Sequence, residues 1–156
     1  MTKETFSDLV LKSEHTLYRI SMSMLKNETD CEDAVQTAIL TAYEKLGALK
    51  HEEYFRTWLV RILINVCNKY LNGRKKIINM DEHTNMPEPS VPSGERSVEV
   101  RMAFESLPVK IRQAMVLYYM EDFSIAEIKE ILRIPEGTVK SRLSKGRQMM
   151  KENLEV

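Results

Sequence analysis

The sequence contains little cysteine, glycine or proline, with two, five and five residues of these types among its 156. Two cysteines cannot form a disulfide-rich scaffold, and the shortage of glycine and proline excludes collagen-like and low-complexity classes. An excess of charge of one sign is also missing, because 23 lysines and arginines balance 23 aspartates and glutamates. The overall charge therefore indicates no partner, and a nucleic-acid surface would have to arise from charges segregated along the chain.

Long hydrophobic runs are absent as well. The longest uninterrupted run, residues 114–120, is far shorter than the roughly 20 residues that cross a membrane. The first residues lack the apolar segment of a signal peptide. We therefore expect a cytoplasmic protein without membrane insertion, whose two thiols stay reduced.

Residues 79–97 interrupt the otherwise periodic pattern. They hold Pro87, Pro89, Pro92 and Gly94 and almost no regularly spaced apolar residue. Because proline fixes φ and removes a hydrogen-bond donor, such a stretch propagates neither a helix nor a central strand. The pattern predicts two domains, residues 1–76 and 98–156, joined by a flexible linker over residues 77–97.

Both domains are predicted to be helical, because apolar residues recur at three- and four-residue spacing. The expected helices cover residues 6–25, 29–47, 53–72, 98–106, 108–119, 124–132 and 138–153. Thr29 with Glu32, and Ser124 with Glu127, have the spacing of capping boxes, and Gly73 is a candidate C-cap. No segment alternates with period two, so the predicted fold class is all-α, in two small bundles.

Charges of one sign gather on particular helices. Residues 28–44 hold five acids and no base, residues 56–76 hold six bases and no acid, and residues 136–151 hold five bases and one acid. Any one of these faces is explained equally well as ordinary solvated surface. Two cationic helices, one of them after a suitable turn, favour contact with nucleic acid.

The last 30 residues have the pattern of a helix-turn-helix. A capped short helix precedes a turn with Pro135 and Gly137, and a cationic helix follows. Its apolar face is expected to pack inward and is formed by Val139, Leu143, Gly146 and Met150. Gly146 is predicted to permit a close approach to another helix. The other face is expected to contact base edges or phosphates in the major groove, through Lys140, Ser141, Ser144, Lys145 and Gln148. Arg142 and Arg147 lie at the flanks of this face and are expected to contact the DNA backbone. A helical hairpin with a hydrated polar face is the alternative interpretation.

The helix predicted over residues 53–72 combines aromatic and cationic side chains near its start. Such a mixture suits a single strand or an opened duplex, where bases stack and phosphates are neutralised. The candidate contacts are Arg56, Trp58, Arg61, Asn65 and Lys69. Trp58 has an equally good explanation as the aromatic anchor of a small core.

Catalytic and metal-binding patterns are not evident. The three histidines are scattered, and neither a P-loop nor a GxSxG or HExxH motif occurs. Neither Cys31 nor Cys67 has a metal-ligand partner at suitable spacing. A helix N-terminus can lower a thiol pKa, so Cys31 is a minor candidate for redox chemistry, but the sequence predicts no enzyme, no metal and no cofactor.

The combination of three blocks resembles the extracytoplasmic-function (ECF, group IV) sigma factors of bacterial RNA polymerase. The blocks are DCEDAVQTAILTAYEKL, FRTWLVRILINVCNKYLNGRKK, and the segment from LPVKIRQAMVLYY to IPEGTVKSRLSKGRQ. The resemblance implies sigma region 2 in the first domain and region 4 in the second. It also implies promoter DNA as a ligand, core polymerase as a partner through its β′ coiled coil and β flap, and control by an anti-sigma factor.

The resemblance carries roles onto individual residues. Asp30, Asp33 and Gln36 match the surface that binds the β′ coiled coil, although Thr37 replaces the acid usual after that glutamine. The helix that begins at Phe55 matches the reader of the −10 element. The last helix matches the reader of the −35 element, with Ser144 where a bulkier residue is common.

Two other functions remain open from the sequence. One is a stand-alone helix-turn-helix regulator, whose first domain would be a sensor or dimerisation bundle. The other is an adaptor, whose acidic helix would bind a partner while its basic helices would only be solvated.

Overall fold

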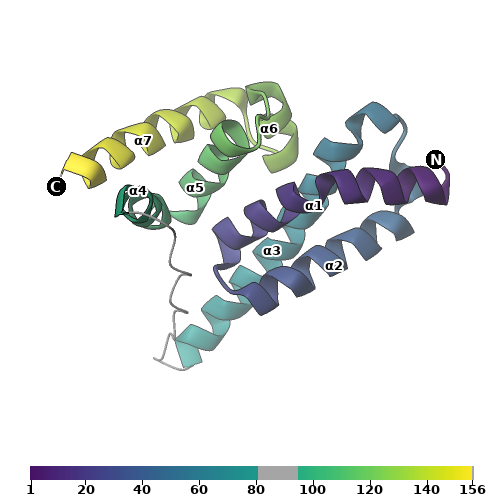
Figure 1. Ribbon diagram of the computed structural model, residues 1–156, viewed down its shortest axis with the longest axis horizontal. Helices are drawn as coiled ribbons and strands as arrows, with labels where there is room; N and C mark the ends of the chain where they lie inside the picture. The colour runs from purple at the N-terminus through teal and green to yellow at the C-terminus, as the bar shows by residue number, and fades with distance from the viewer. Residues whose placement is uncertain (81–94, 156) are drawn as a thin grey trace. The chain divides into compact units, whose positions relative to one another are not determined.

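The computed structural model describes residues 1–80 and 95–155, and the described part of the chain is helical without any strand (Figure 1). The chain divides into two compact units, Met1–Pro87 and Glu88–Val156. The all-α prediction is confirmed. No helix in the described ranges is both long and apolar enough to cross a membrane.

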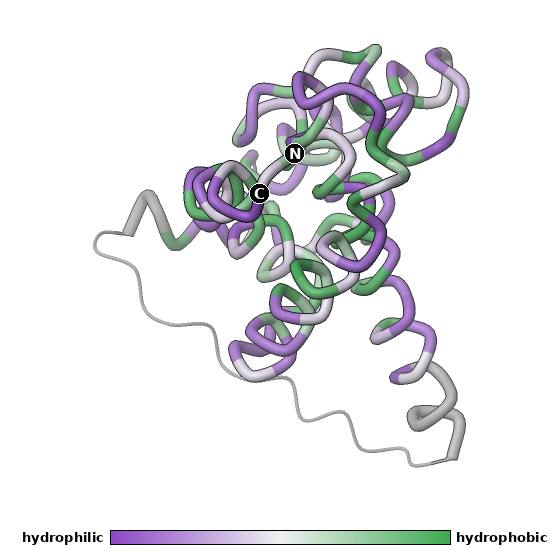
Figure 2. Tube along the Cα trace, turned by 90° about the vertical axis from the view of Figure 1, so that its right-hand side faces the viewer, coloured by the Kyte–Doolittle hydropathy of each residue, from purple (hydrophilic) through white to green (hydrophobic). Residues whose placement is uncertain are grey.

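Residues 1–80, the described part of the first unit, form a bundle of three helices, in which each helix contacts the other two. They are α1 (Lys3–Leu25), α2 (Glu28–Glu44) and α3 (Phe55–Met80), and two short 3₁₀ turns, Leu46–Ala48 and Glu52–Tyr54, connect α2 to α3. Hydrophobic and hydrophilic residues are interspersed along the helical turns of the chain (Figure 2), as expected for amphipathic helices. The buried side chains include Leu17, Ile20, Ala38, Phe55, Leu59 and Leu63.

The corner between α1 and α2 differs from the sequence prediction. Lys26 takes the left-handed conformation, with φ of 58°, and its N–H bonds to the carbonyl of Met22, which ends α1. Asn27 then caps α2, because its side chain accepts a bond of 3.0 Å from the N–H of Asp30. The predicted capping box at Thr29 is therefore wrong. Asn27 follows the turn at Lys26 directly, and asparagine is a strong N-cap residue, so the cap lies two residues before the predicted Thr29.

The ends of the predicted linker are also corrected by the structure. Helix α3 does not end at Gly73 but continues to Met80, and α4 begins at Glu95. Residues 77–80 and 95–97, assigned to the linker from sequence, are thus helical. The remaining linker residues, 81–94, lie outside the described residues. The predicted end of the acidic helix near Gly47 is wrong as well, since α2 ends at Glu44.

Residues 95–155, the described part of the second unit, form four helices and one π-helical turn. They are α4 (Glu95–Glu105), α5 (Val109–Met115), which continues as the π turn η3 (Val116–Met120), α6 (Ile125–Leu132) and α7 (Glu136–Glu155). Helix α7 contacts α4, α5 and α6, and so lies at the centre of the packing. The buried side chains include Leu107, Leu117, Phe123, Ile128, Val139 and Leu143.

Candidate nucleic-acid and polymerase interfaces

Helices α6 and α7 form the predicted helix-turn-helix. The capping box at the start of α6 is complete, because Ser124 Oγ accepts from the N–H of Glu127 (3.1 Å) and Glu127 Oε1 accepts from the N–H of Ser124 (2.9 Å). Arg133 ends α6 in the left-handed conformation, with its N–H bonded to the carbonyl of Lys129. The N–H of Thr138 bonds to the carbonyl of Pro135 at the start of α7. Both ends of the turn are therefore fixed by hydrogen bonds.

One face of α7 is buried against the second unit. Val139, Leu143 and Gly146 are buried, as the sequence predicted, and Met150 is partly exposed. The predicted close approach at Gly146 is present, because Met115 and Ile111 of α5 lie directly against it. This packing fixes which side of α7 faces solvent.

The solvent face of α7 carries most of the predicted −35 residues. The exposed members are Lys140, Ser141, Ser144, Lys145 and Gln148. Lys140 forms an exposed ion pair of 3.1 Å with Glu136, one turn before it, and Gln148 Nε2 donates to Glu152 Oε1 at 3.3 Å. Both contacts lie within α7, so they leave the face open to a ligand.

The two arginines of the predicted −35 set lie at the flanks of this face. Arg142 is only partly exposed. Arg147 is exposed, but its Nη1 donates to the hydroxyl of Tyr119 at 3.0 Å, so its side chain turns toward η3. The flanking positions that the sequence predicted for both arginines agree with this placement.

The predicted −10 residues divide between two sides of α3. Trp58, Arg61, Asn65 and Lys69 recur every three or four residues and share one side, where Asn65 and Lys69 are exposed. Arg56 lies about 140° around the helix from Arg61, because each residue of an α-helix turns by about 100°. The structure therefore does not bring Arg56 onto the same face as the other four residues.

Trp58 has features of both interpretations that the sequence left open. Its ring centroid lies 6.0 Å from that of Phe55, which is itself buried and packs edge-on against Phe6. Trp58 nevertheless remains partly exposed. The indole therefore borders the core and keeps a surface that a base can reach.

The outer side of α2 carries Asp33 and Gln36, both exposed. Leu40 follows one turn later and is 60% exposed, which makes it an uncovered apolar residue beside two polar ones. Sequence reasoning did not select Leu40, although its position off the buried stripe of α2 was a usable signal.

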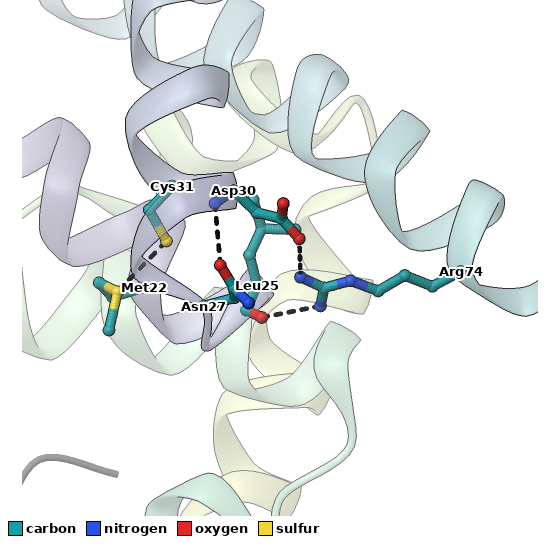
Figure 3. Close-up of polar contacts among 6 residues, drawn as sticks. All are labelled: Met22, Leu25, Asn27, Asp30, Cys31 and Arg74. Atoms are coloured by element: carbon teal, nitrogen blue, oxygen red, sulfur yellow. Dashed lines mark hydrogen bonds and ion pairs between the residues drawn. The ribbon is translucent and has the colours of Figure 1, made fainter. Parts of the chain in front are cut away.

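Asp30 lies one turn before Asp33, toward the side of α2 that borders α3, and its side chain is 32% exposed. Its carboxylate faces Arg74 of α3, with 2.5 Å between Arg74 Nη2 and Asp30 Oδ2, and Arg74 Nη1 donates to the carbonyl of Leu25 at 2.7 Å (Figure 3). Sequence reasoning did not select Arg74 for this site, because it predicted that the helix would end at residue 72 with Gly73 as its C-cap.

The two cysteines lie in the core of the first unit. Burial raises the pKa of both thiols, that of Cys67 to about 12. Cys31 Sγ lies 3.2 Å from Met22 Sδ (Figure 3). A protonated, enclosed thiol is a poor nucleophile, so the minor redox role considered for Cys31 is not supported. Within the described ranges, no group of three or more His, Cys, Asp or Glu side chains could hold a metal ion.

The second unit has an apolar groove of about 830 Å³ that sequence reasoning did not identify. It is lined by Val100, Arg101, Phe104, Met115, Tyr119, Met120, Arg147 and Met150. Tyr119 and Met120 belong to the π turn and are about half exposed. Three methionines give the groove an adaptable apolar surface.

Comparison with known families assigns each unit separately. Residues 9–77 match the family described as Sigma-70 region 2, and residues 97–150 match Sigma-70, region 4. The two units thus define the class, that of proteins that carry these two sigma-70 regions.

Whole-chain relatives specify the family within this class. The chain is 30% identical to the ECF RNA polymerase sigma factor SigW of Bacillus subtilis, over 97% of this chain and 90% of SigW. It is also 30% identical to the ECF RNA polymerase sigma-E factor of Escherichia coli K12, over 94% and 84% of the two chains. The chain belongs to the ECF sigma factors of RNA polymerase.

Solved structures agree with this fold. The sigma factor RpoE, in its co-crystal structure with the anti-sigma factor NepR from Bartonella quintana, has a TM-score of 0.87 and 22% identity over 98% of both chains. CnrH, in complex with the cytosolic domain of CnrY, has a TM-score of 0.75 and 22% identity over 99% of this chain and 90% of CnrH.

Proposed function

We propose that this sigma factor reads the −35 element of its promoters with the solvent face of α7. The observation that carries the proposal is the division of α7 into a buried apolar side and an exposed side of lysine, serine and glutamine residues. Lysine and glutamine side chains donate to base edges and phosphates in the major groove. Lys140, Ser141, Ser144, Lys145 and Gln148 supply these contacts, and Arg142 and Arg147 lie at the flanks.

The −10 element is assigned to the side of α3 that carries Trp58, Arg61, Asn65 and Lys69. The partly exposed indole offers a surface for an unstacked base, and the cations beside it neutralise phosphates of the separated strand. Arg56 has a lesser role in this proposal, because it lies on a different side of the helix.

Core polymerase is assigned two contacts. Asp33, Gln36 and Leu40 on α2 form the face for the β′ coiled coil, where an apolar residue between polar ones suits a helical partner. The apolar groove of the second unit suits an amphipathic segment of the β flap. An anti-sigma factor would then inhibit the protein by covering one of these surfaces, in keeping with the complexes in which RpoE and CnrH were solved.

The stand-alone regulator and the adaptor are less well supported. Both would leave unexplained why sigma-70 regions 2 and 4 occur together in one chain.

In vitro transcription with purified core polymerase tests the proposal. Promoters selected from a DNA library by the reconstituted holoenzyme should be transcribed only when the chain is present. The Lys140→Ala/Lys145→Ala variant should bind core normally but lose most of this transcription. The matched control, Lys3→Ala/Lys12→Ala, removes two exposed lysines of α1 and should retain it. A chain that fails to join core polymerase, or equal transcription by both variants, would disprove the assignment.

A further inference from the structure

The ends of α1 and α2 and the C-terminal part of α3 meet at a single guanidinium group, that of Arg74 (Figure 3). Its Nη1 donates to the carbonyl of Leu25, the last residue of α1, at 2.7 Å. Its Nη2 donates to Asp30 Oδ2 in the first turn of α2, at 2.5 Å. One side chain of α3 thus binds both helices that adjoin the α1–α2 corner.

The corner itself is short, and beyond it α2 is held by its packing against α1 and α3. Only Lys26 and Asn27 separate α1 from α2, and their caps act within the local chain. The angle at which α2 leaves the corner determines where its outer side lies. Asp33 and Gln36 follow Asp30 by one and two turns, so a rotation at the corner displaces both.

Asp30 already takes part in two contacts within the chain, although its side chain is about one third exposed. Its carboxylate bonds to Arg74, and its backbone N–H donates to the side chain of Asn27. Asp33, by contrast, is exposed on the outer side of α2. A direct contact between Asp30 and a partner would have to compete with the bond to Arg74.

We propose that Arg74 is a positioning residue for polymerase binding, and that Asp30 acts on polymerase affinity through Arg74 rather than by touching the partner. The proposal rests on the proposed function, in which α2 binds the polymerase. The planar guanidinium suits this position because its fixed fork of donors reaches a carboxylate and a carbonyl together. A lysine ammonium is a single compact charge and does not reproduce that geometry.

A double-mutant cycle on the full-length chain distinguishes indirect from direct action. The affinity for purified core polymerase is measured for Asp30→Asn, Arg74→Gln and the double variant, at a temperature where circular dichroism shows all three folded. We expect each single variant to bind core polymerase about three- to tenfold more weakly than the unaltered chain. The double variant should bind no more weakly than either single variant, because both substitutions break the same Arg74–Asp30 contact. If the two losses multiply instead, Asp30 acts independently of Arg74 and the proposal is wrong.

Two further variants exclude simpler explanations. Val60→Ala truncates a buried residue of α3 away from the corner, so it should lower the thermal midpoint without changing the affinity for core. If affinity simply follows stability across the variants, Arg74 has only a general structural role and the proposal fails. Arg74→Lys keeps the positive charge but not the fork of donors, so we expect its affinity for core polymerase to lie between those of the unaltered chain and Arg74→Gln. If Arg74→Gln does not fold, Arg74→Lys replaces it in the double-mutant cycle.

Asp33→Asn separates this inference from the proposed function. If Asp33→Asn weakens binding while Arg74→Gln does not, the positioning role is disproved and the α2 face stands. If Asp30 and Arg74 are coupled while Asp33→Asn has no effect, the positioning role stands, and the α2 contact must be assigned to other residues. If none of these variants alters the affinity, both ideas are wrong.

Discussion

At the scale of single residues, Gly146 shows how tightly α7 packs on α5. A methyl group at this position would lie 2.6 Å from Sδ of Met115, 2.8 Å from its Cγ and 3.1 Å from Cγ2 of Ile111. Both neighbours are buried, and the isoleucine is stiff at χ1. A side chain here therefore requires Met115 to move.

Gly146→Ala should lower the free energy of unfolding of the second unit by about 1 kcal/mol, because the cost of overpacking against Met115 is larger than the stabilisation gained from alanine's higher helix propensity. Gly73→Ala is the matched control, since nothing lies within 4 Å of its added methyl group. It should raise the stability of the first unit by about 0.5–1 kcal/mol. Urea unfolding checks both, with the fluorescence of Trp58, the single tryptophan, reporting on the first unit. Equal stabilisation by both changes would contradict the tight packing.

Cys67 should make the first unit sensitive to alkaline pH. Burial raises the pKa of its thiol from about 9 to about 12 in the folded protein. Its contribution to stability is therefore complete below pH 9, where the thiol is protonated in both states, and is lost as the pH rises toward 12. The loss approaches about 1.4 kcal/mol per pH unit within that window. Urea unfolding at pH 7.5, 9 and 10 should show a steeper decline for the natural chain than for Cys67→Ala, and parallel declines would refute this.

At the scale of elements, the capping box of α6 determines how the helix-turn-helix begins. Ser124→Ala removes the acceptor for the N–H of Glu127 and should destabilise the second unit by about 1 kcal/mol. Ser141→Ala, an exposed site on α7, should change stability by less than about 0.5 kcal/mol. Thermal unfolding followed by circular dichroism compares the two. Similar midpoints would mean that the tertiary contacts of α6 alone determine its stability.

The same local signature succeeded at α6 and failed at α2, which shows what local patterns can predict. Asp122 precedes Ser124 by two residues, as Asn27 precedes Thr29, but Asp122 takes the left-handed conformation, with φ of 59°, and Ser124 is the cap. At α2, the left-handed turn at Lys26 ends α1, and Asn27, the next residue, becomes the N-cap in place of Thr29. That turn depends on the packing of two helices, and the sequence pattern does not contain this information.

The length of α3 limited the prediction of the candidate site. Gly73 was interpreted as a helix end, but glycine inside a helix costs only about 1 kcal/mol, and the helix continues to Met80. Arg74 was therefore not placed on a helix that reaches Asp30, which is distant in sequence. The position of Arg56, by contrast, was available from helical spacing, and was missed because cations were grouped by charge rather than by face.

At the scale of the whole molecule, the zero net charge conceals two cationic helices and one acidic helix. Each cationic face can neutralise only a few phosphates, which gives weak and salt-sensitive binding. Two weak modules on one chain gain effective concentration only when their separation fits both DNA elements. In the proposed function, core polymerase fixes that separation.

The free chain should therefore bind promoter duplex only weakly, with a Kd of roughly 10⁻⁴ to 10⁻⁶ M, whereas the holoenzyme should bind it tightly and specifically. Fluorescence anisotropy with labelled promoter, at 50 and 200 mM salt, compares the chain, core polymerase and both together. In the holoenzyme, Lys140→Ala/Lys145→Ala should reduce the slope of log K against log salt by about 2, because two phosphate contacts are lost. Lys3→Ala/Lys12→Ala should leave that slope unchanged. Tight, specific binding by the free chain would show instead that the two faces are held at the correct separation without polymerase.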